Sequence, residues 1–177
     1  MSFVNFFKHL HTINKHRRYV RRYCFKVGLF WQGLFHDMSK YSCTEFWPGV
    51  KYYQGFRSPN EQEREEYGYS KAWLHHKGRN KHHFEYWYDY VAAVKAYRPV
   101  KMPLKYVKEM FCDRVAASKI YKKEKYNNRS ALDYYLSHNA REKMHVDTAN
   151  LLESWLTMLA EQGEKETFKV IKKTKEY

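Results

Sequence analysis

Apolar residues near the start of the chain recur at three- and four-residue steps, the spacing of one face of an α-helix. This spacing predicts a helix over residues 3–23. Ile13 and Val20 lie on its apolar face, Cys24 continues that face just beyond it, and His16 shares it. The 177 residues include seven glycines and four prolines, few for a β-sandwich or a β-barrel. Hydrophobic residues make up 44%, enough for a buried core. We therefore expect one all-α domain.

Further helices are expected along the rest of the chain. An apolar run over 28–37 ends at His36 and Asp37, and Ser58 can cap a helix that begins at Pro59. Residues 41–69 contain prolines, glycines and many aromatics, which indicates an irregular excursion after the second helix. The other expected helices cover 70–77, 82–97, 103–121, a short segment after 130, 140–161 and a basic segment after Gly163.

The formal charge of +14 favours anionic partners such as phosphate substrates, nucleic acid or acidic lipid surfaces. Simple solubility is the alternative interpretation. The basic residues are densest over 15–22 and 169–175.

The three cysteines lie far apart with no CxxC pair, so neither a disulfide framework nor a cysteine zinc site is expected. No run approaches eighteen apolar residues, and Lys8 interrupts the first segment. We expect a cytoplasmic protein without a membrane span or a secretory leader.

Four histidines lie within nine residues, in the order His75, His76, His82 and His83. Imidazole is the commonest metal ligand in proteins. Gly78 interrupts the expected helix, so the two pairs are interpreted as clusters joined by a loop. Surface histidines in a basic patch are the alternative.

Asp113 falls on an apolar stripe of its expected helix, between Met110 and Ala117. A buried carboxylate is costly unless it meets a cation or hydrogen-bond donors. A metal ion and an arginine or lysine partner both remain open for Asp113. His16 taken alone fits a packed core histidine, and the pair His36–Asp37 taken alone is a weak signal.

In chain order, His16, the pair His36–Asp37 and Asp113 form a pattern that resembles the HD superfamily of metal-dependent phosphohydrolases. The phrase GLFHDMSK is similar to that family's apolar HDxxK phrase, and CDRVAAS is similar to the stretch around its last aspartate. The resemblance covers about residues 9–120. More narrowly, the chain resembles a small bacterial and phage family with HDxSKYS and HHKGRNKHH signatures, which implies no particular activity.

The resemblance implies an HD-like helical bundle over 1–177, with a metal-site core over about 9–120 and C-terminal helices over 130–175. His16, His36, Asp37 and Asp113 would hold one ion. Asp37 could bridge to a second ion held by one histidine of the pair His75/His76 and one of the pair His82/His83. The chain lacks the GYP motif of the two-metal HD-GYP proteins and has Lys77 where they carry an acid, so cleavage of cyclic dinucleotides is not expected.

Mixed nitrogen and oxygen ligands suit Mn, Fe, Co, Ni or Zn, as one or two ions. The expected activity is hydrolysis of a nucleotide or a related small phosphate ester by a metal-bound hydroxide, in the EC 3.1 class. Lys40 and Asp37 are the expected catalytic residues, and Lys77, Arg79 and Asn80 are expected to bind substrate phosphate.

Two other functions stay open, namely an HD-type di-iron oxygenase and a basic helical protein that binds nucleic acid. The aromatic segment Tyr52–Arg57 could form a wall for a nucleobase or could pack the excursion. Glu45 and Glu109 could each act as a general base or support the ligands from behind, and helix-surface charge is the favoured interpretation of both.

Overall fold

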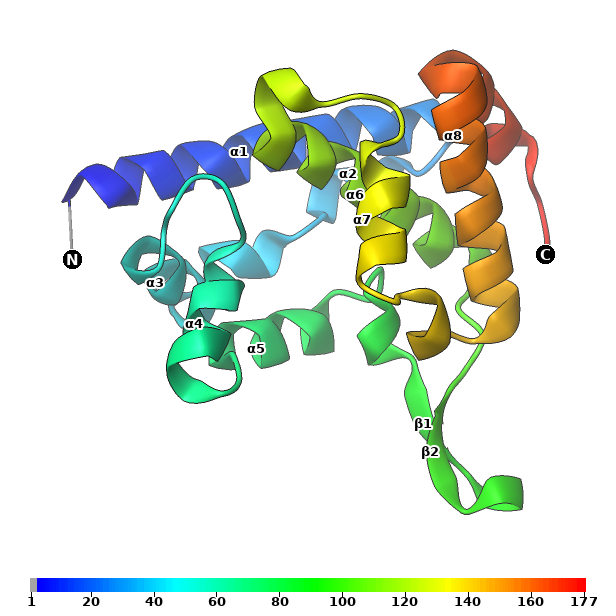
Figure 1. Ribbon diagram of the computed structural model, residues 1–177, viewed down its shortest axis with the longest axis horizontal. Coiled ribbons are helices and arrows are strands. Elements are labelled where there is room, and N and C mark those ends of the chain that lie inside the picture. Colours follow the sequence, from blue (N-terminus) through cyan, green and yellow to red (C-terminus); the bar gives the residue numbers. More distant parts are fainter. Residues whose placement is uncertain (1–2) are drawn as a thin grey trace.

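The computed structural model describes residues 3–177, and over this range the fold is all-α with one small β-hairpin (Figure 1). This confirms the all-α expectation. None of the described helices is long and apolar enough to cross a membrane. The α-helices are α1 Phe3–Lys26, α2 Phe30–Phe35, α3 Cys43–Lys51, α4 Pro59–Tyr67, α5 Lys71–Arg79, α6 Leu104–Lys122, α7 Ser130–Ser137 and α8 Val146–Lys173. Short 3₁₀ turns cover Met38–Tyr41, Phe84–Tyr86, Ala92–Val94, Lys123–Lys125 and Arg141–Lys143.

The main core lies where α1, α6, α7 and α8 pack together. Val20 from α1, Phe111 and Val115 from α6, Tyr135 from α7 and Leu156 from α8 are all completely buried. Burial of a large apolar side chain contributes about 1.5–3 kcal/mol, so this cluster fixes α6 against α1. The side chains at the edge of that interface, His16 and Asp113, are thereby held at fixed positions.

A smaller cluster joins α3 to the first half of α1. Ile13 packs against Phe46 and Val50. At the same contact Gly49 lies directly against the ring of His9, and a Cβ atom at position 49 would come within 2.1 Å of the His9 Nε2 atom. Only glycine allows this close approach of the two helices.

The excursion expected over 41–69 contains two short helices, α3 and α4, and the helix expected to begin at Pro59 is α4. Pro48 lies inside α3, and Ser58 caps α4 by accepting a hydrogen bond from the Asn60 amide, with Pro59 at the first helical position. The expectation that Gly78 interrupts the helix was wrong, since α5 continues to Arg79.

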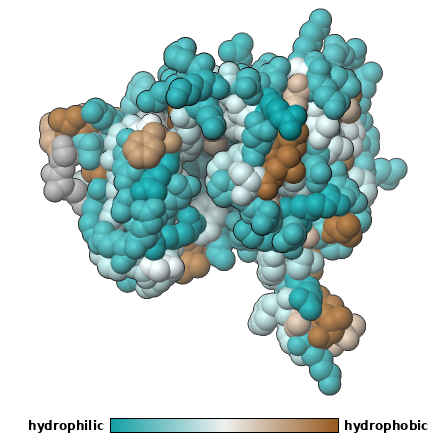
Figure 2. Space-filling model, in the orientation of Figure 1, coloured by the Kyte–Doolittle hydropathy of each residue, from teal (hydrophilic) through white to brown (hydrophobic). Residues whose placement is uncertain are grey.

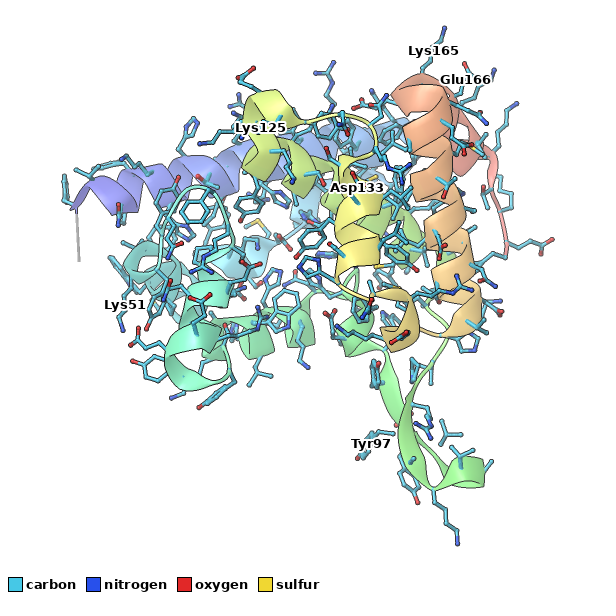
Figure 3. All side chains as sticks on the ribbon, viewed as in Figure 1. Lys51, Tyr97, Lys125, Asp133, Lys165 and Glu166 are labelled. Carbon is cyan, nitrogen blue, oxygen red and sulfur yellow. The ribbon has the colours of Figure 1, made fainter. Side chains whose placement is uncertain are left out.

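The expectation of a helix over residues 82–97 was wrong. This stretch forms a 3₁₀ turn followed by the antiparallel strands β1 Tyr88–Val91 and β2 Ala96–Pro99, with Lys95 in the left-handed region at φ 49°. Tyr90 faces Tyr97 across the pair, and aromatic cross-strand pairs favour sheet over helix. The hairpin extends away from the helices, with Tyr97 exposed along it (Figure 3).

Candidate metal centre

The turn after α2 brings His36 and Asp37 to the centre of the molecule. α2 ends at Phe35, the His36 backbone is extended, and Asp37 is left-handed at φ 53°. A left-handed conformation costs an L-residue roughly 1–2 kcal/mol. Arg17 compensates by clamping the turn, because its guanidinium group donates to the His36 carbonyl at 2.8 Å and to the Leu34 carbonyl at 3.0 Å. Arg17, which belongs to the basic run of α1, therefore has a structural role.

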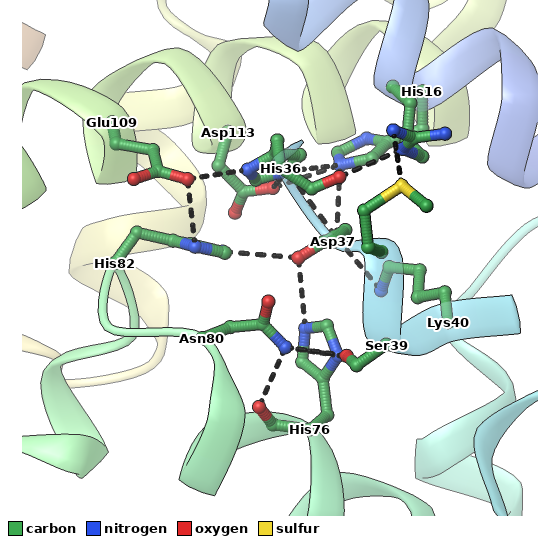
Figure 4. A network of polar contacts seen from close by, with 12 residues as sticks. His16, His36, Asp37, Ser39, Lys40, His76, Asn80, His82, Glu109 and Asp113 are labelled. Carbon is green, nitrogen blue, oxygen red and sulfur yellow. Dashed lines mark hydrogen bonds and ion pairs between the residues drawn. The ribbon is translucent and has the colours of Figure 1, made fainter. Parts of the chain in front are cut away.

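A first group of possible ligands comprises His16, His36, Asp37 and Asp113. The His16 Nε2 atom lies 3.0 Å from Asp113 Oδ1 and 3.7 Å from Asp37 Oδ2. The His36 Nε2 atom lies 3.4 Å from Asp37 Oδ2 and 3.5 Å from Asp113 Oδ1. The structure thus brings together the four residues expected for one ion (Figure 4).

A second group lies on the other side of Asp37 and comprises His76, His82 and His83 together with that aspartate. The Asp37 Oδ1 atom is 3.4 Å from His76 Nε2 and 3.5 Å from His82 Nε2. Asp37 therefore points one carboxylate oxygen at each group. His75 lies outside the group, because its Nδ1 atom contacts Glu45 at 2.7 Å instead.

The second group contains polar atoms that are buried without any hydrogen-bond partner within residues 3–177. They are Asp37 Oδ1, His76 Nε2, His82 Nε2 and His83 Nε2. An unsatisfied buried polar atom costs about 1–3 kcal/mol. Each of the four residues offers a possible ligand atom within 4.8 Å of those of the others. A cation would satisfy all four at once. The residues present therefore fit a metal ion, and these clusters could bind one.

Two buried glutamates orient the histidines from behind. One Glu109 oxygen accepts from His36 Nδ1 at 2.9 Å and contacts His82 Nδ1 at 3.3 Å, while Glu45 accepts from His76 Nδ1 at 2.7 Å. Each contact leaves Nε2 facing Asp37 or its group, the usual carboxylate–histidine arrangement behind a metal. Reading Glu45 and Glu109 as surface charges was wrong. Glu109 is one helical turn before Asp113, and that spacing is the signal that could have found it.

The carboxylates of the site are charged and attract a cation. Burial raises the pKa of Asp37, but His36 and Lys40 outweigh it and hold that pKa well below the ordinary value. The pKa of Asp113 is likewise lowered, against the effect of burial, by hydrogen bonds from His16 and His36. Burial, reinforced by His82 and His76, holds the pKa of His83 well below its usual range. Burial lowers the pKa of His36, but Asp37, Asp113 and Glu109 outweigh it and raise that pKa well above the ordinary value. The acids are thus charged and His83 is neutral, whereas His36 carries a proton that a bound ion would displace.

Lys40 lies beside the candidate metal centre, whereas the three residues expected to bind substrate, Lys77, Arg79 and Asn80, lie away from the cavity. The Lys40 Nζ atom lies 3.2 Å from Asp37 Oδ2, beside the centre. Lys77, Arg79 and Asn80 do not line the adjoining cavity. Because α5 continues past Gly78, Arg79 is turned to solvent, and Asn80 donates to Ser39 Oγ and to the His76 carbonyl. The expectation that Lys77, Arg79 and Asn80 bind substrate stays a prediction, which the lining of this cavity does not support.

A cavity of about 820 Å³ opens beside the first group and Lys40. Its walls come from α1, α3, α4, α5, α6 and α7, and the surface is hollowed there on the face shown in Figure 2. Tyr53, Phe56 and Arg57 line it, as the aromatic-wall interpretation requires, whereas Tyr52 is buried outside it. The cavity is large enough for a substrate of nucleotide size.

The model of the family described as "Family of unknown function (DUF5662)" matches residues 5–158. The chain belongs to this family. The DUF5662 match includes every candidate ligand from His16 to Asp113 and the first part of α8, as far as residue 158. No curated protein matches the chain, and no solved structure matches it.

Proposed function

We propose that the protein is a metal-dependent phosphohydrolase that acts on a nucleotide or a related small phosphate ester. The observation that carries the proposal is the position of Asp37, whose two carboxylate oxygens face two separate ligand groups beside a deep cavity. Paired ions that share a carboxylate are a recurrent arrangement for phosphate-ester hydrolysis.

His16, His36, Asp37 and Asp113 would hold one ion, and Asp37 with His76, His82 and His83 would offer the ligands for another. When bound, divalent ions at these positions would lower the pKa of water and neutralise phosphoryl oxygens. The ligand chemistry suits Mn, Fe, Co, Ni or Zn.

Lys40 supplies the positive charge on the cavity side of the centre. Burial lowers its pKa, but the carboxylate of Asp37 raises the pKa above the ordinary value, so the ammonium group stays charged. This group lines the cavity and can donate to a phosphoryl oxygen that rests beside Asp37.

The test is release of phosphate from a panel of nucleotides by protein supplied with Mn²⁺ or Co²⁺. We expect metal-dependent release that is lost, at least a hundredfold, in His36→Ala and in Asp37→Ala. His11→Ala is the matched control, because His11 is exposed on α1 outside both groups. Absence of any release across the panel with each of these metals would overturn the proposal.

The same ligand set favours a second candidate, an HD-type di-iron oxygenase, because the second group is rich in histidine. That function predicts about two irons per chain after aerobic purification and a coloured oxidised form. The alternative of nucleic-acid binding predicts affinity that falls steeply with salt and survives Asp37→Ala.

A further inference from the structure

The cavity beside the candidate centre carries more positive charge than Lys40 alone. Its cationic lining residues fall into two classes. Lys40 and Arg57 are paired with Asp37 and Glu65, at 3.2 Å and 2.5 Å. The others form no ion pair with any residue in the range 3–177, and they are Arg64, Arg114, Lys122 and Lys143.

Aromatic rings, and not carboxylates, position the two unpaired arginines. The Arg64 guanidinium carbon lies 5.4 Å from the centre of the Trp73 ring, and that of Arg114 lies 5.8 Å from the centre of the Tyr135 ring. Such contacts hold the planar group while its N–H donors remain open for another partner. Neither guanidinium group donates a hydrogen bond to any described residue, and the Nε atom of Arg114 is buried without a partner.

The two arginines act on one region of the cavity. Both guanidinium groups line the same cavity, which the carboxylates of Glu61 and Glu85 also line. The same two charges also lower the pKa of Tyr134, which burial and Glu61 raise. Arg64 from α4 and Arg114 from α6 are therefore within electrostatic reach of the same groups, although they come from different walls. Arg114 directly follows Asp113, so this region adjoins the first ligand group.

We propose that Arg64 and Arg114 form an anion-binding subsite for a second phosphoryl group, so that the substrate carries two or more phosphates. The reaction itself rests on the proposed function. The subsite, however, binds a phosphoryl group whether or not hydrolysis follows. Bidentate recognition by guanidinium groups suits a terminal phosphate, and two unpaired arginines with open donors match its charge and oxygen count. One phosphoryl group would lie beside Asp37 and Lys40, and the next would lie between α4 and α6.

The test is calorimetric titration of the full-length chain with inorganic phosphate and with tripolyphosphate, in the presence of EDTA. Chelation removes any ion that could bridge phosphate to Asp37, so binding reports the protein's own cations. We expect tripolyphosphate to bind at least ten times more tightly than phosphate. Arg64→Ala and Arg114→Ala should each weaken tripolyphosphate binding about tenfold or more. Arg98→Ala, on the exposed hairpin outside the cavity, should leave it unchanged.

A second variant guards against loss of folding at position 114. Arg114→Lys keeps the charge and most of the packing on Tyr135 but removes the forked pair of donors, and it should still weaken binding several-fold. Unchanged affinity in both Arg64→Ala and Arg114→Lys would overturn the subsite. The titration contains no metal and no turnover, so its failure is distinct from failure of phosphate release in the nucleotide panel.

Discussion

Arg17 and His36 are joined by a hydrogen bond of 2.8 Å that links the middle of α1 to the turn carrying the central aspartate. The same guanidinium group donates to the Leu34 carbonyl and to the Tyr41 hydroxyl, so it closes the end of α2. Three separate contacts from one side chain make this turn dependent on α1.

Removal of this clamp should loosen the centre. We expect Arg17→Ala to lower the free energy of unfolding by about 2–3 kcal/mol, because hydrogen bonds from a charged donor to half-buried carbonyls are lost. Urea denaturation measures the change. Arg18→Ala, at the exposed neighbouring position, should change stability by less than about 0.5 kcal/mol. Equal effects of the two variants would contradict the clamp.

Glu109 should control metal affinity through its contacts with the Nδ1 atoms of His36 and His82. In Glu109→Gln the charge behind the His36 and His82 rings is lost, and we expect metal affinity to fall about 10–100-fold. Competition for Zn²⁺ against a fluorescent chelator measures it. Glu161→Gln, at an exposed position on α8, is the control and should bind as the wild type does.

The adjacent histidines His75 and His76 should differ sharply in metal stoichiometry. His76 Nε2 faces Asp37, whereas His75 contacts Glu45 outside the ligand groups. We expect His76→Ala to lose the second ion and keep the first, and His75→Ala to keep both. Metal analysis of protein dialysed against limiting Mn²⁺ or Zn²⁺ gives the number of ions per chain. A wild-type chain that binds a single ion would contradict the two-ion arrangement.

The centre illustrates which parts of a site the sequence can predict. His36, Asp37 and Asp113 are predicted as ligands from their order along the chain, which resembles the HD superfamily, because the apolar pattern alone leaves their roles open. The sequence left His75/His76 open, because Gly78 hid the continuity of α5 that turns His76 inward. Glu109 was interpreted as a surface charge because a glutamate on a charged helix resembles a solvent-facing residue until α6 is packed on α1 and Glu109 meets His36.

The fold was predicted best where the apolar period was long. α1 and α6 were expected close to their observed bounds, since each carries an apolar stripe along several turns. The stretch 82–97 has many aromatics and no clear period, and Tyr90 pairs with Tyr97 only after the chain reverses at Lys95. Such a pairing depends on tertiary register, which no local pattern contains.

His9 should make stability pH-dependent in the metal-free protein. Burial, with a smaller contribution from Lys40, lowers its pKa from 6.5 to about 4. Between these values the unfolded chain binds the proton and the folded chain does not, so stability falls as pH drops from about 6.5 to 4. The difference of 6.5 − 4 corresponds to about 3 kcal/mol. Denaturation in EDTA at pH 7 and pH 4 should show that His9→Gln loses less stability over this range than the wild type does.

Two glycines in helices should respond oppositely to alanine. Gly49→Ala places a Cβ atom against the His9 ring and should destabilise the protein by about 1–3 kcal/mol. Gly78→Ala meets no atom within 4 Å and should stabilise α5 by about 0.5–1 kcal/mol, because alanine favours a helix. Thermal unfolding of both variants measures the change in stability. A stabilised Gly49→Ala would contradict the close packing of α1 on α3.

The spread of the ligands along the chain bears on how the protein matures. His16 lies in α1 and Asp113 in α6, with the other ligands between them. During synthesis the histidine-rich segment leaves the ribosome before α6 can pack onto α1. If these ligands bind a cation, capture would be a late event in biogenesis, and a chain truncated ahead of α6 would expose its imidazoles without enclosing an ion.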